Sequence, residues 1–201
     1  MPYPLSEASR TSVTRLLKED EILVFPTETV YGLGGNALSA KAVQKVYRTK
    51  KRTPDKAMPV LVDQAWLEKL VPTRNERIDE LISTFWPGPL TLILQAPPEL
   101  PCFLKGPGGT LALRWSDSKV VQELIRLGKC PLIGTSANLS GRPECLSAAE
   151  VEAQFKERTP PIVDGGILKQ TPPSTLLDCS RDRFRLLRTG SLGTTVLKPY
   201  L

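Results

Sequence analysis

Prolines place the first limit on the fold, because 19 of them are distributed along the chain. A proline inside a helix removes a backbone hydrogen bond and clashes with the preceding turn, and in a central strand it interrupts the ladder. We therefore expect many short helices and strands joined by rigid turns, rather than long helices. A chain of 201 residues can still bury a core without disulfides or a metal, and we expect one domain over residues 1–201.

The composition argues against several kinds of site and location. The chain has no histidine, so the commonest metal ligand and the commonest general base are both missing. Its four cysteines are far apart and form no CxxC pair, which predicts reduced thiols in a cytoplasmic protein. No apolar run resembles a signal peptide or is long enough to span a bilayer, so we expect no membrane partner. The formal net charge of +6 favours anionic partners without requiring nucleic acid.

Apolar periodicity predicts helices and strands that intermix along the chain. We expect helices over residues 6–18, 40–48, 64–70, 75–85, 120–127 and 148–155. We expect strands over residues 21–25, 58–62, 90–94, 110–115, 131–135, 162–163, 174–177 and 183–187. The connections between 90–94 and 110–115, and between 174–177 and 183–187, are too short for a crossover helix. The pattern therefore predicts an α/β protein with a twisted, mixed, open sheet flanked by helices.

The stretch from Phe25 to Ala37 is the strongest functional signal. Pro26 halts an apolar run, hydroxyl groups follow, and three glycines allow a tight turn and the close approach of a ligand. Alternate side chains of an extended backbone share a face. On that pattern we expect one face to carry Thr27, Thr29 and Tyr31, and the other to carry Glu28 and Val30. The stretch then provides a floor of hydroxyl groups beneath a ligand.

Cations from three other places are candidates to face the same ligand. Lys50 and Arg52 alternate in a loop that we expect to be too polar for the core, which suggests a cationic lid. Arg114 shares a strand face with Thr110, opposite three large apolar residues, so it is either solvated or directed into a cleft. Arg188 has the strand parity of the apolar residues before it. It should therefore point inward, where a guanidinium group needs an anion.

The glycines also match a relaxed dinucleotide fingerprint, Gly32-x-Gly34-x-x-Ala37. That fingerprint requires its glycines directly after a strand and at the start of a helix, whereas Thr27–Tyr31 intervenes here. The sequence contains no Walker A motif and no carboxylate cluster with metal-ligand spacing. We therefore expect neither a nicotinamide site nor a protein-ligated metal.

Taken singly, the polar groups have ordinary explanations. The basic run at 50–52 is typical of a solvated surface, and Ser136 and Asn138 are typical of a turn whose side chains bond their own backbone. Together with Thr29 and Arg114, they supply cations and hydroxyl groups without a histidine or an acidic base. That combination suits the stabilisation of phosphate charge more than the abstraction of a proton.

Seven motifs stand in order along the chain: Pro26–Gly34, Lys50-x-Arg52, Trp86–Thr91, Thr110-x-x-x-Arg114, Ser136–Gly141, Pro173–Asp178 and Arg188-x-Gly190. Their order and spacing resemble the YrdC-type threonylcarbamoyl-AMP synthases across roughly residues 10–190. The resemblance implies a YrdC-like α/β twist with a concave basic cleft. It also implies the short form of the family, without the extra C-terminal domain of the longer members.

The resemblance implies a nucleotidyltransferase that joins L-threonine, bicarbonate or CO2, and ATP into threonylcarbamoyl-adenylate and pyrophosphate. The carbamate would form on the amine of threonine, and its oxygen would then attack the α-phosphate of ATP. Mg²⁺ is expected to accompany ATP, and the product would pass to a separate tRNA threonylcarbamoyl transferase. The alternative is a non-catalytic RNA- or nucleotide-binding protein that uses the same concave face, with weak RNA binding.

Roles for individual residues follow from the matching motif positions. The resemblance assigns Lys50 and Arg52 to catalysis, holding the triphosphate and the developing pyrophosphate, and Thr29 and Arg114 to the binding of threonine. It assigns the nucleotide contacts to Arg52, Lys56, Thr110, Ser136, Asn138 and Arg188, where Lys56 is a substitute phosphate contact. The sequence departs from the family pattern at Lys56, Leu61, Gly134 and Glu144, and in the run 114–118, which lacks the usual proline and histidine. These departures leave open whether activity is lower or the substrate differs.

Overall fold

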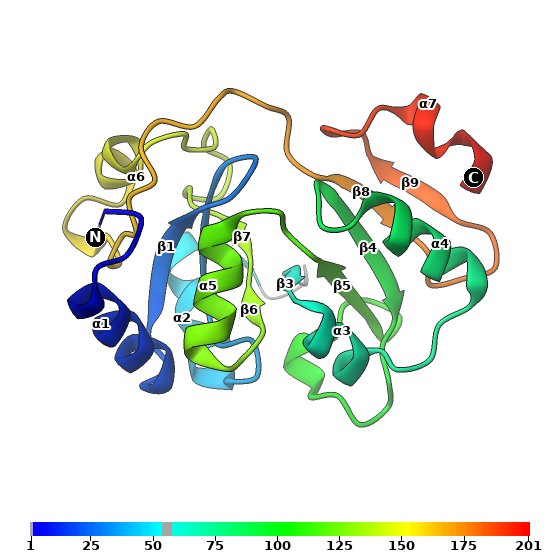
Figure 1. The fold of residues 1–201 in the computed structure, drawn as a ribbon, viewed down its shortest axis with the longest axis horizontal. Coiled ribbons are helices and arrows are strands. Elements are labelled where there is room, and N and C mark those ends of the chain that lie inside the picture. Colours follow the sequence, from blue (N-terminus) through cyan, green and yellow to red (C-terminus); the bar gives the residue numbers. More distant parts are fainter. Residues whose placement is uncertain (1, 54–57) are drawn as a thin grey trace.

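Two β-sheets frame the molecule in a computed structural model that describes residues 2–53 and 58–201 (Figure 1). The strands are β1 (Ile22–Pro26), β2 (Tyr31–Gly35), β3 (Val60–Leu61), β4 (Leu90–Gln95), β5 (Thr110–Arg114), β6 (Leu132–Ile133), β7 (Thr135–Ser136), β8 (Thr175–Asp178) and β9 (Arg185–Arg188). The smaller sheet has the order β1-β2-β7 and is antiparallel. The larger has the order β6-β3-β5-β4-β8-β9, with β3/β5 and β4/β8 parallel and the other pairs antiparallel. The predicted mixed α/β class is therefore confirmed.

Helices cover the sheets and begin where the sequence supplies a capping side chain. They are α1 (Glu7–Lys18), α2 (Ala40–Lys50), α3 (Gln64–Leu70), α4 (Glu76–Phe85), α5 (Lys119–Gly128), α6 (Ala148–Phe155) and α7 (Thr194–Leu197), with short 3₁₀ turns η1 (Cys102–Leu104), η2 (Lys156–Arg158) and η3 (Lys198–Tyr200). From α1 to α6, each helix has an N-cap side chain that accepts a backbone N–H: Ser6, Ser39, Asp63, Asn75, Ser118 and Ser147. Such caps contribute about 1 kcal/mol each, which explains why predicted and observed helix starts agree to within one residue.

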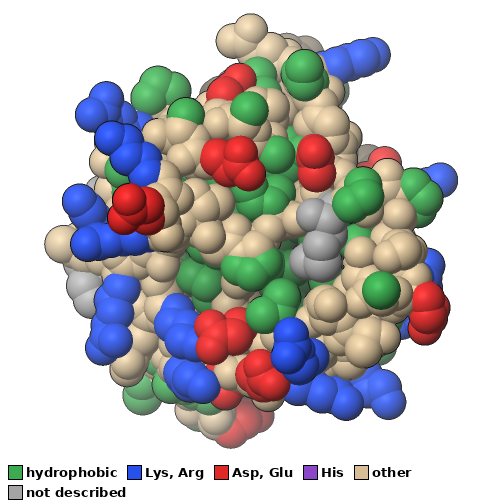
Figure 2. All heavy atoms as spheres, turned by 90° about the vertical axis from the view of Figure 1, so that its left-hand side faces the viewer, with side chains coloured by type: hydrophobic (Ala, Val, Ile, Leu, Met, Phe, Trp, Pro, Cys, Tyr) green, Lys and Arg blue, Asp and Glu red, His purple; other side chains and the backbone are tan. Residues whose placement is uncertain are grey.

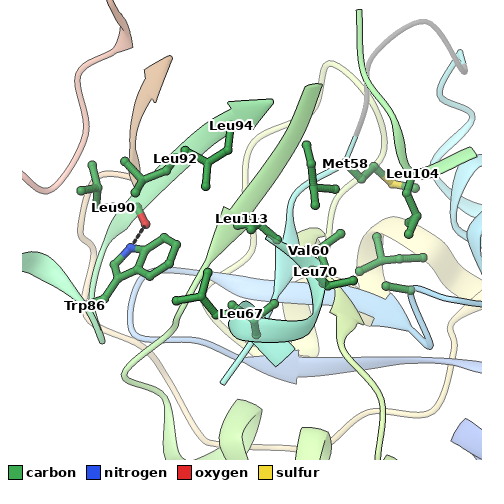
Figure 3. Packing of buried hydrophobic residues seen from close by; sticks show 14 of the residues in the cluster. Met58, Val60, Leu67, Leu70, Trp86, Leu90, Leu92, Leu94, Leu104 and Leu113 are labelled. Atoms are coloured by element: carbon green, nitrogen blue, oxygen red, sulfur yellow. Dashed lines mark hydrogen bonds between the residues drawn. The ribbon is translucent and has the colours of Figure 1, made fainter. Parts of the chain in front are cut away.

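Apolar residues of both sheets pack against helices. In the smaller sheet, β1 and β2 lie between α2 on one side and α1 with α5 on the other (Figure 1). In the larger sheet, leucines of β4 and β5 point toward α3, and the Trp86 indole N–H donates to the Leu90 carbonyl at 2.7 Å (Figure 3). The opposite face of β4 and β5 is therefore left for a cleft. No helix among the described residues is long and apolar enough to cross a membrane.

The two predicted short connections are hairpin pairs. β4 pairs antiparallel with β5, and β8 pairs antiparallel with β9, as their spacing predicts. The predicted strand over 131–135 is divided into β6 and β7, which belong to different sheets. Residues 162–163 contribute only an isolated bridge between Ile162 and Val24.

The region after β1 differs from the prediction. The stretch expected to be a glycine loop is β2, which pairs with β1 from Gly35 opposite Ile22 to Tyr31 opposite Pro26. The predicted alternation over Thr27–Tyr31 is wrong, because Thr27 forms a tight turn: its hydroxyl donates to the Val30 carbonyl at 2.7 Å and accepts the Val30 N–H at 3.2 Å. Within such a turn, strand parity no longer applies.

Two further expectations are corrected. Lys50 is the last residue of α2 and is only 3% exposed, so it does not lie in a solvated loop. The helix predicted over 120–127 was expected to end at Gly128 as a glycine C-cap, but Gly128 belongs to α5, and Lys129 follows it in the left-handed conformation at φ 50°. A Cβ atom on Gly128 would lie 2.7 Å from the Leu17 side chain, so the glycine allows α1 to approach α5.

Candidate functional site

A cavity of about 380 Å³ opens against the face of the larger sheet that is turned away from α3. Both sheets and several loops contribute to its lining. The lining residues are Thr29, Val30, Arg52, Pro59, Thr91, Ile93, Gly106, Pro107, Thr110, Ala112, Arg114, Gly134, Thr135, Ser136, Glu144, Pro173, Ser174, Leu176 and Arg188. The predicted parity of β5 is confirmed, because Thr110, Ala112 and Arg114 line this cavity whereas Leu111 and Leu113 are buried in the core.

The structure brings most of the predicted site residues to one place. The cavity is lined by Thr29, Arg52, Thr110, Arg114, Ser136 and Arg188. Lys50 and Asn138 instead line an adjoining hollow, which shares Arg52, Thr135 and Ser136 with the cavity. Lys56 lies outside the described residues. The shared residues make the two hollows neighbours along one surface.

Arg114 is buried in the cavity wall, with 7% of its surface exposed. Its Nε donates to the Gly88 carbonyl at 3.3 Å, and its Nη2 donates to the Thr29 hydroxyl at 3.4 Å. Nη2 also lies 2.8 Å from Oε1 of Glu28. Burial alone would raise the pKa of Glu28, but the charge of Arg114 and the hydrogen bond from Ser116 outweigh it, so the pKa is lower than usual.

Lys50 is directed at the loop that follows β7. Its ammonium group donates to the Ser136 carbonyl, to the Asn138 carbonyl at 2.8 Å and to Asn138 Oδ1 at 3.2 Å. The Ser136 hydroxyl donates to the same Oδ1 at 2.6 Å. Burial, assisted by the charge of Arg52, lowers the pKa of Lys50 to about 8. Lys50 therefore holds the loop that carries Ser136 and Asn138, rather than acting as an exposed lid.

Arg188, the last residue of β9, is held by Ser174, the residue before β8. Its Nε and Nη2 donate to the Ser174 carbonyl at 3.2 and 2.9 Å. The Ser174 hydroxyl is in turn 2.8 Å from the hydroxyl of Thr91, and both side chains are buried. Arg188 thus reaches the cavity from β9, but the predicted parity is wrong. The register of β8 and β9 shifts between Leu176 and Leu177, so Arg188 pairs with Leu176, which lines the cavity, whereas Leu186 pairs with Leu177 of the core.

Sequence reasoning assigned no site role to Thr91, Ser174, Glu28 or Ser116. Thr91 alternates with the core leucines of β4, so strand parity alone could have placed it on the cavity face. Glu28 and Ser116 gave no such signal, because they meet through a contact between residues 88 positions apart. The result is a site of guanidinium and hydroxyl groups, and among the described residues no group of three or more Asp, Glu, Cys or His side chains could hold a metal.

Comparisons with known proteins agree with this arrangement. Residues 15–190 match the family model Sua5_yciO_yrdC, described as "Telomere recombination". The chain is 41% identical over 179 residues to the threonylcarbamoyl-AMP synthase of Bacillus subtilis, covering 88% of this chain and 52% of that protein. It is 36% identical over 178 residues to the threonylcarbamoyl-AMP synthase of Klebsiella pneumoniae, covering 86% of this chain and 92% of that protein.

Solved structures of proteins from this family share the fold of this chain. The structure of Pyrococcus abyssi Sua5 complexed with L-threonine matches with a TM-score of 0.91 and 32% identity, covering 100% of this chain and 59% of that one. Escherichia coli YciO matches with a TM-score of 0.84 at 22% identity, covering 98% of this chain and 94% of that one, a likeness in fold. The chain spans about half the length of the Bacillus subtilis and Pyrococcus abyssi relatives.

Proposed function

The chain belongs to the Sua5/YciO/YrdC family, and from this premise we propose that it is a threonylcarbamoyl-AMP synthase. It would join L-threonine, bicarbonate or CO2, and ATP into threonylcarbamoyl-adenylate, with release of pyrophosphate. The observation that carries this proposal is the meeting of Arg52, Arg114 and Arg188 with several hydroxyl groups on one cavity. Such a site binds and neutralises anions, and this reaction has anionic substrates at every step.

Threonine would bind at the Arg114 end of the cavity. Nη2 of this guanidinium contacts Glu28 and Thr29, and Nε donates to the Gly88 carbonyl. Nη1 is therefore the nitrogen suited to a charge-assisted hydrogen bond with the substrate carboxylate. The Thr29 hydroxyl would contact the same substrate. Threonine as a ligand is supported by the likeness to Pyrococcus abyssi Sua5, whose structure is complexed with L-threonine.

The triphosphate of ATP would lie toward Arg52 and the adjoining hollow. Arg52 and Ser136 line both hollows, so they are suited to hold a phosphate chain that extends from one into the other. Lys50 would act indirectly, by fixing the loop that presents Ser136 and Asn138. Mg²⁺ would arrive with ATP, held by phosphate oxygens and water, since Mg²⁺ commonly binds through substrate phosphates.

The remaining nucleotide contacts would come from the β8–β9 side and from β5. Arg188 is held by Ser174 and has its guanidinium group at the cavity. Thr110 lines the cavity from the start of β5. A carbamate oxygen could then attack the α-phosphorus while pyrophosphate leaves toward Arg52. The protein would contribute alignment and charge neutralisation, which requires no side-chain nucleophile.

The cellular setting follows from the same proposal. The adenylate is a reactive product, so it would pass to a tRNA threonylcarbamoyl transferase. A cytoplasmic location is supported by the four cysteines, which are all free thiols in the structure.

The rival interpretation is a non-catalytic protein that binds RNA. On the face shown in Figure 2, which is the left-hand side of Figure 1, Lys and Arg side chains gather along the left-hand edge but are mixed with Asp and Glu elsewhere, so this face gives little support to a broad phosphate-binding surface.

The decisive experiment measures pyrophosphate release from ATP by the purified protein. We expect release that requires both L-threonine and bicarbonate. Release that is unaffected by omitting threonine, or no release together with salt-sensitive RNA binding, would overturn the proposal in favour of a different enzyme or of the RNA-binding reading.

A further inference from the structure

Glu28 joins the turn between β1 and β2 to the turn that follows β5. The Ser116 hydroxyl donates to Oε2 of Glu28, and the Asp117 backbone N–H donates to Oε1 at 3.2 Å. Ser116 is itself fully buried and accepts the Ser118 N–H at 3.2 Å. Both carboxylate oxygens are therefore held by the turn at 116–118, so the position of the carboxylate is set before any ligand binds.

The same carboxylate contacts the guanidinium group of Arg114. Oε1 of Glu28 lies 2.8 Å from Nη2, which also donates to the Thr29 hydroxyl at 3.4 Å, while Nε of Arg114 donates to the Gly88 carbonyl at 3.3 Å. Among the described residues, no hydrogen bond involves Nη1 of Arg114. Nε and Nη2 are thus occupied by protein, and Nη1 is left for a ligand in the cavity.

We propose that Glu28 and Ser116 are positioning residues for Arg114: Ser116 orients the Glu28 carboxylate, and Glu28 fixes the plane of the guanidinium group toward the carboxylate of an amino-acid substrate. This inference rests on the proposed function, because it names threonine as that substrate. Neither residue touches the substrate in this scheme.

Orientation, rather than charge, is the contribution that this arrangement makes. The negative charge of Glu28 partly offsets that of Arg114, so charge alone would weaken the attraction for a substrate carboxylate. A hydrogen bond from Nη1 to a substrate carboxylate, however, requires the plane of the guanidinium group to be aligned with that carboxylate. Without Glu28, the buried guanidinium of Arg114 would lose its counter-charge and turn toward other acceptors. On loss of Glu28, the disordered orientation of Arg114 should therefore weaken threonine binding more than the added positive charge strengthens it.

The test compares two serines of the same turn. Ser116→Ala removes the donor to Glu28, whereas Ser118→Ala removes a hydroxyl that donates instead to the Pro26 carbonyl at 3.0 Å. The dissociation constants of L-threonine and of a non-hydrolysable ATP analogue are measured separately by calorimetry. We expect Ser116→Ala to weaken threonine binding about three- to tenfold, with the affinity for the ATP analogue unchanged. Glu28→Gln should weaken threonine binding at least as much, and Ser118→Ala should lower only the melting temperature.

Equal threonine affinity in Ser116→Ala and Ser118→Ala would overturn the inference, as would a parallel loss of threonine and nucleotide affinity, which would indicate general damage to the cavity. The binding readout also separates this inference from the proposed function. If the wild type binds threonine but releases no pyrophosphate, the proposed reaction fails while the positioning roles are still decided by the variants. If the wild type does not bind threonine, both are wrong.

Discussion

A Cβ atom on Gly34 would lie 1.7 Å from the carbonyl oxygen of Ile133. The backbone of β2 thus contacts that of β6 directly, at the point where the smaller sheet meets the larger one. Since the obstructing atom is backbone oxygen, no change of side-chain rotamer can make room. The glycine is needed here for the close approach of two strands, β2 and β6, and not for a turn.

Gly34→Ala should therefore be strongly destabilising. Overpacking usually costs about 1–3 kcal/mol, and a clash with backbone should reach the upper end of that range. The free energy of unfolding in urea measures the effect. Gly193→Ala is a matched control, because a Cβ atom there meets nothing within 4 Å. A stability loss that is equally small at both positions would contradict the close contact between β2 and β6.

Arg114→Ala should raise the KM for threonine while changing the KM for ATP little. Removing a charged hydrogen bond costs roughly 1.5–3 kcal/mol, which corresponds to about a 10- to 150-fold change in affinity. Steady-state pyrophosphate release at varied threonine concentration gives the value. Arg183→Ala, at an exposed position, provides the control for loss of an arginine. An unchanged KM for threonine would refute the assignment of Arg114.

Lys50→Met should destabilise the protein by leaving buried oxygens of Ser136 and Asn138 without a donor, at a cost of about 1–3 kcal/mol. The difference from the wild type should depend on pH. Because the pKa of Lys50 falls from 10.5 in the unfolded chain to about 8 in the folded one, the unfolded chain binds more protons between these values. The wild type should therefore gain stability relative to Lys50→Met as pH rises from 8 to 10.5. Denaturation at pH 7 and pH 10 measures this change, and a constant difference would exclude a lowered pKa.

Cysteine reactivity should single out Cys102, which is exposed, whereas the other three thiols are buried. Burial raises the pKa of Cys130 and Cys179 to about 12 and that of Cys145 to about 11. Since the thiolate is the reactive form, a thiol reagent at pH 8 should label Cys102 rapidly in the native protein and all four cysteines after unfolding. Cys102→Ser should abolish the rapid phase; rapid native labelling of Cys130 would contradict its burial.

The sequence predicted the features that depend on local chemistry. Apolar periodicity predicted a helix over 75–85, which the structure has at Glu76–Phe85, and alternation in β5 put Arg114 on the same face as Thr110, which is the cavity face. These signals are carried by neighbouring residues, so a pattern of a few positions is enough to detect them.

The features that were missed depend on residues far apart in sequence. β2 is largely glycine and shows no strand pattern, and it forms because β1 and β7 pair with it. Lys50 looked solvated, yet its ammonium group finds acceptors 86 and 88 positions away. Strand alternation predicted that Glu28 would lie on the face opposite Thr27 and Thr29. Because Thr27 forms a turn instead, Glu28 contacts Arg114.

Residues 132–136 form an uninterrupted run whose first part pairs in the larger sheet and whose last part pairs in the smaller one. A hinge motion that separated the two sheets would have to break the pairing of this run with β2 or with β3. We therefore expect the cavity to keep its frame throughout turnover, with ligands exchanged past the loops at its mouth instead of through movement of two lobes.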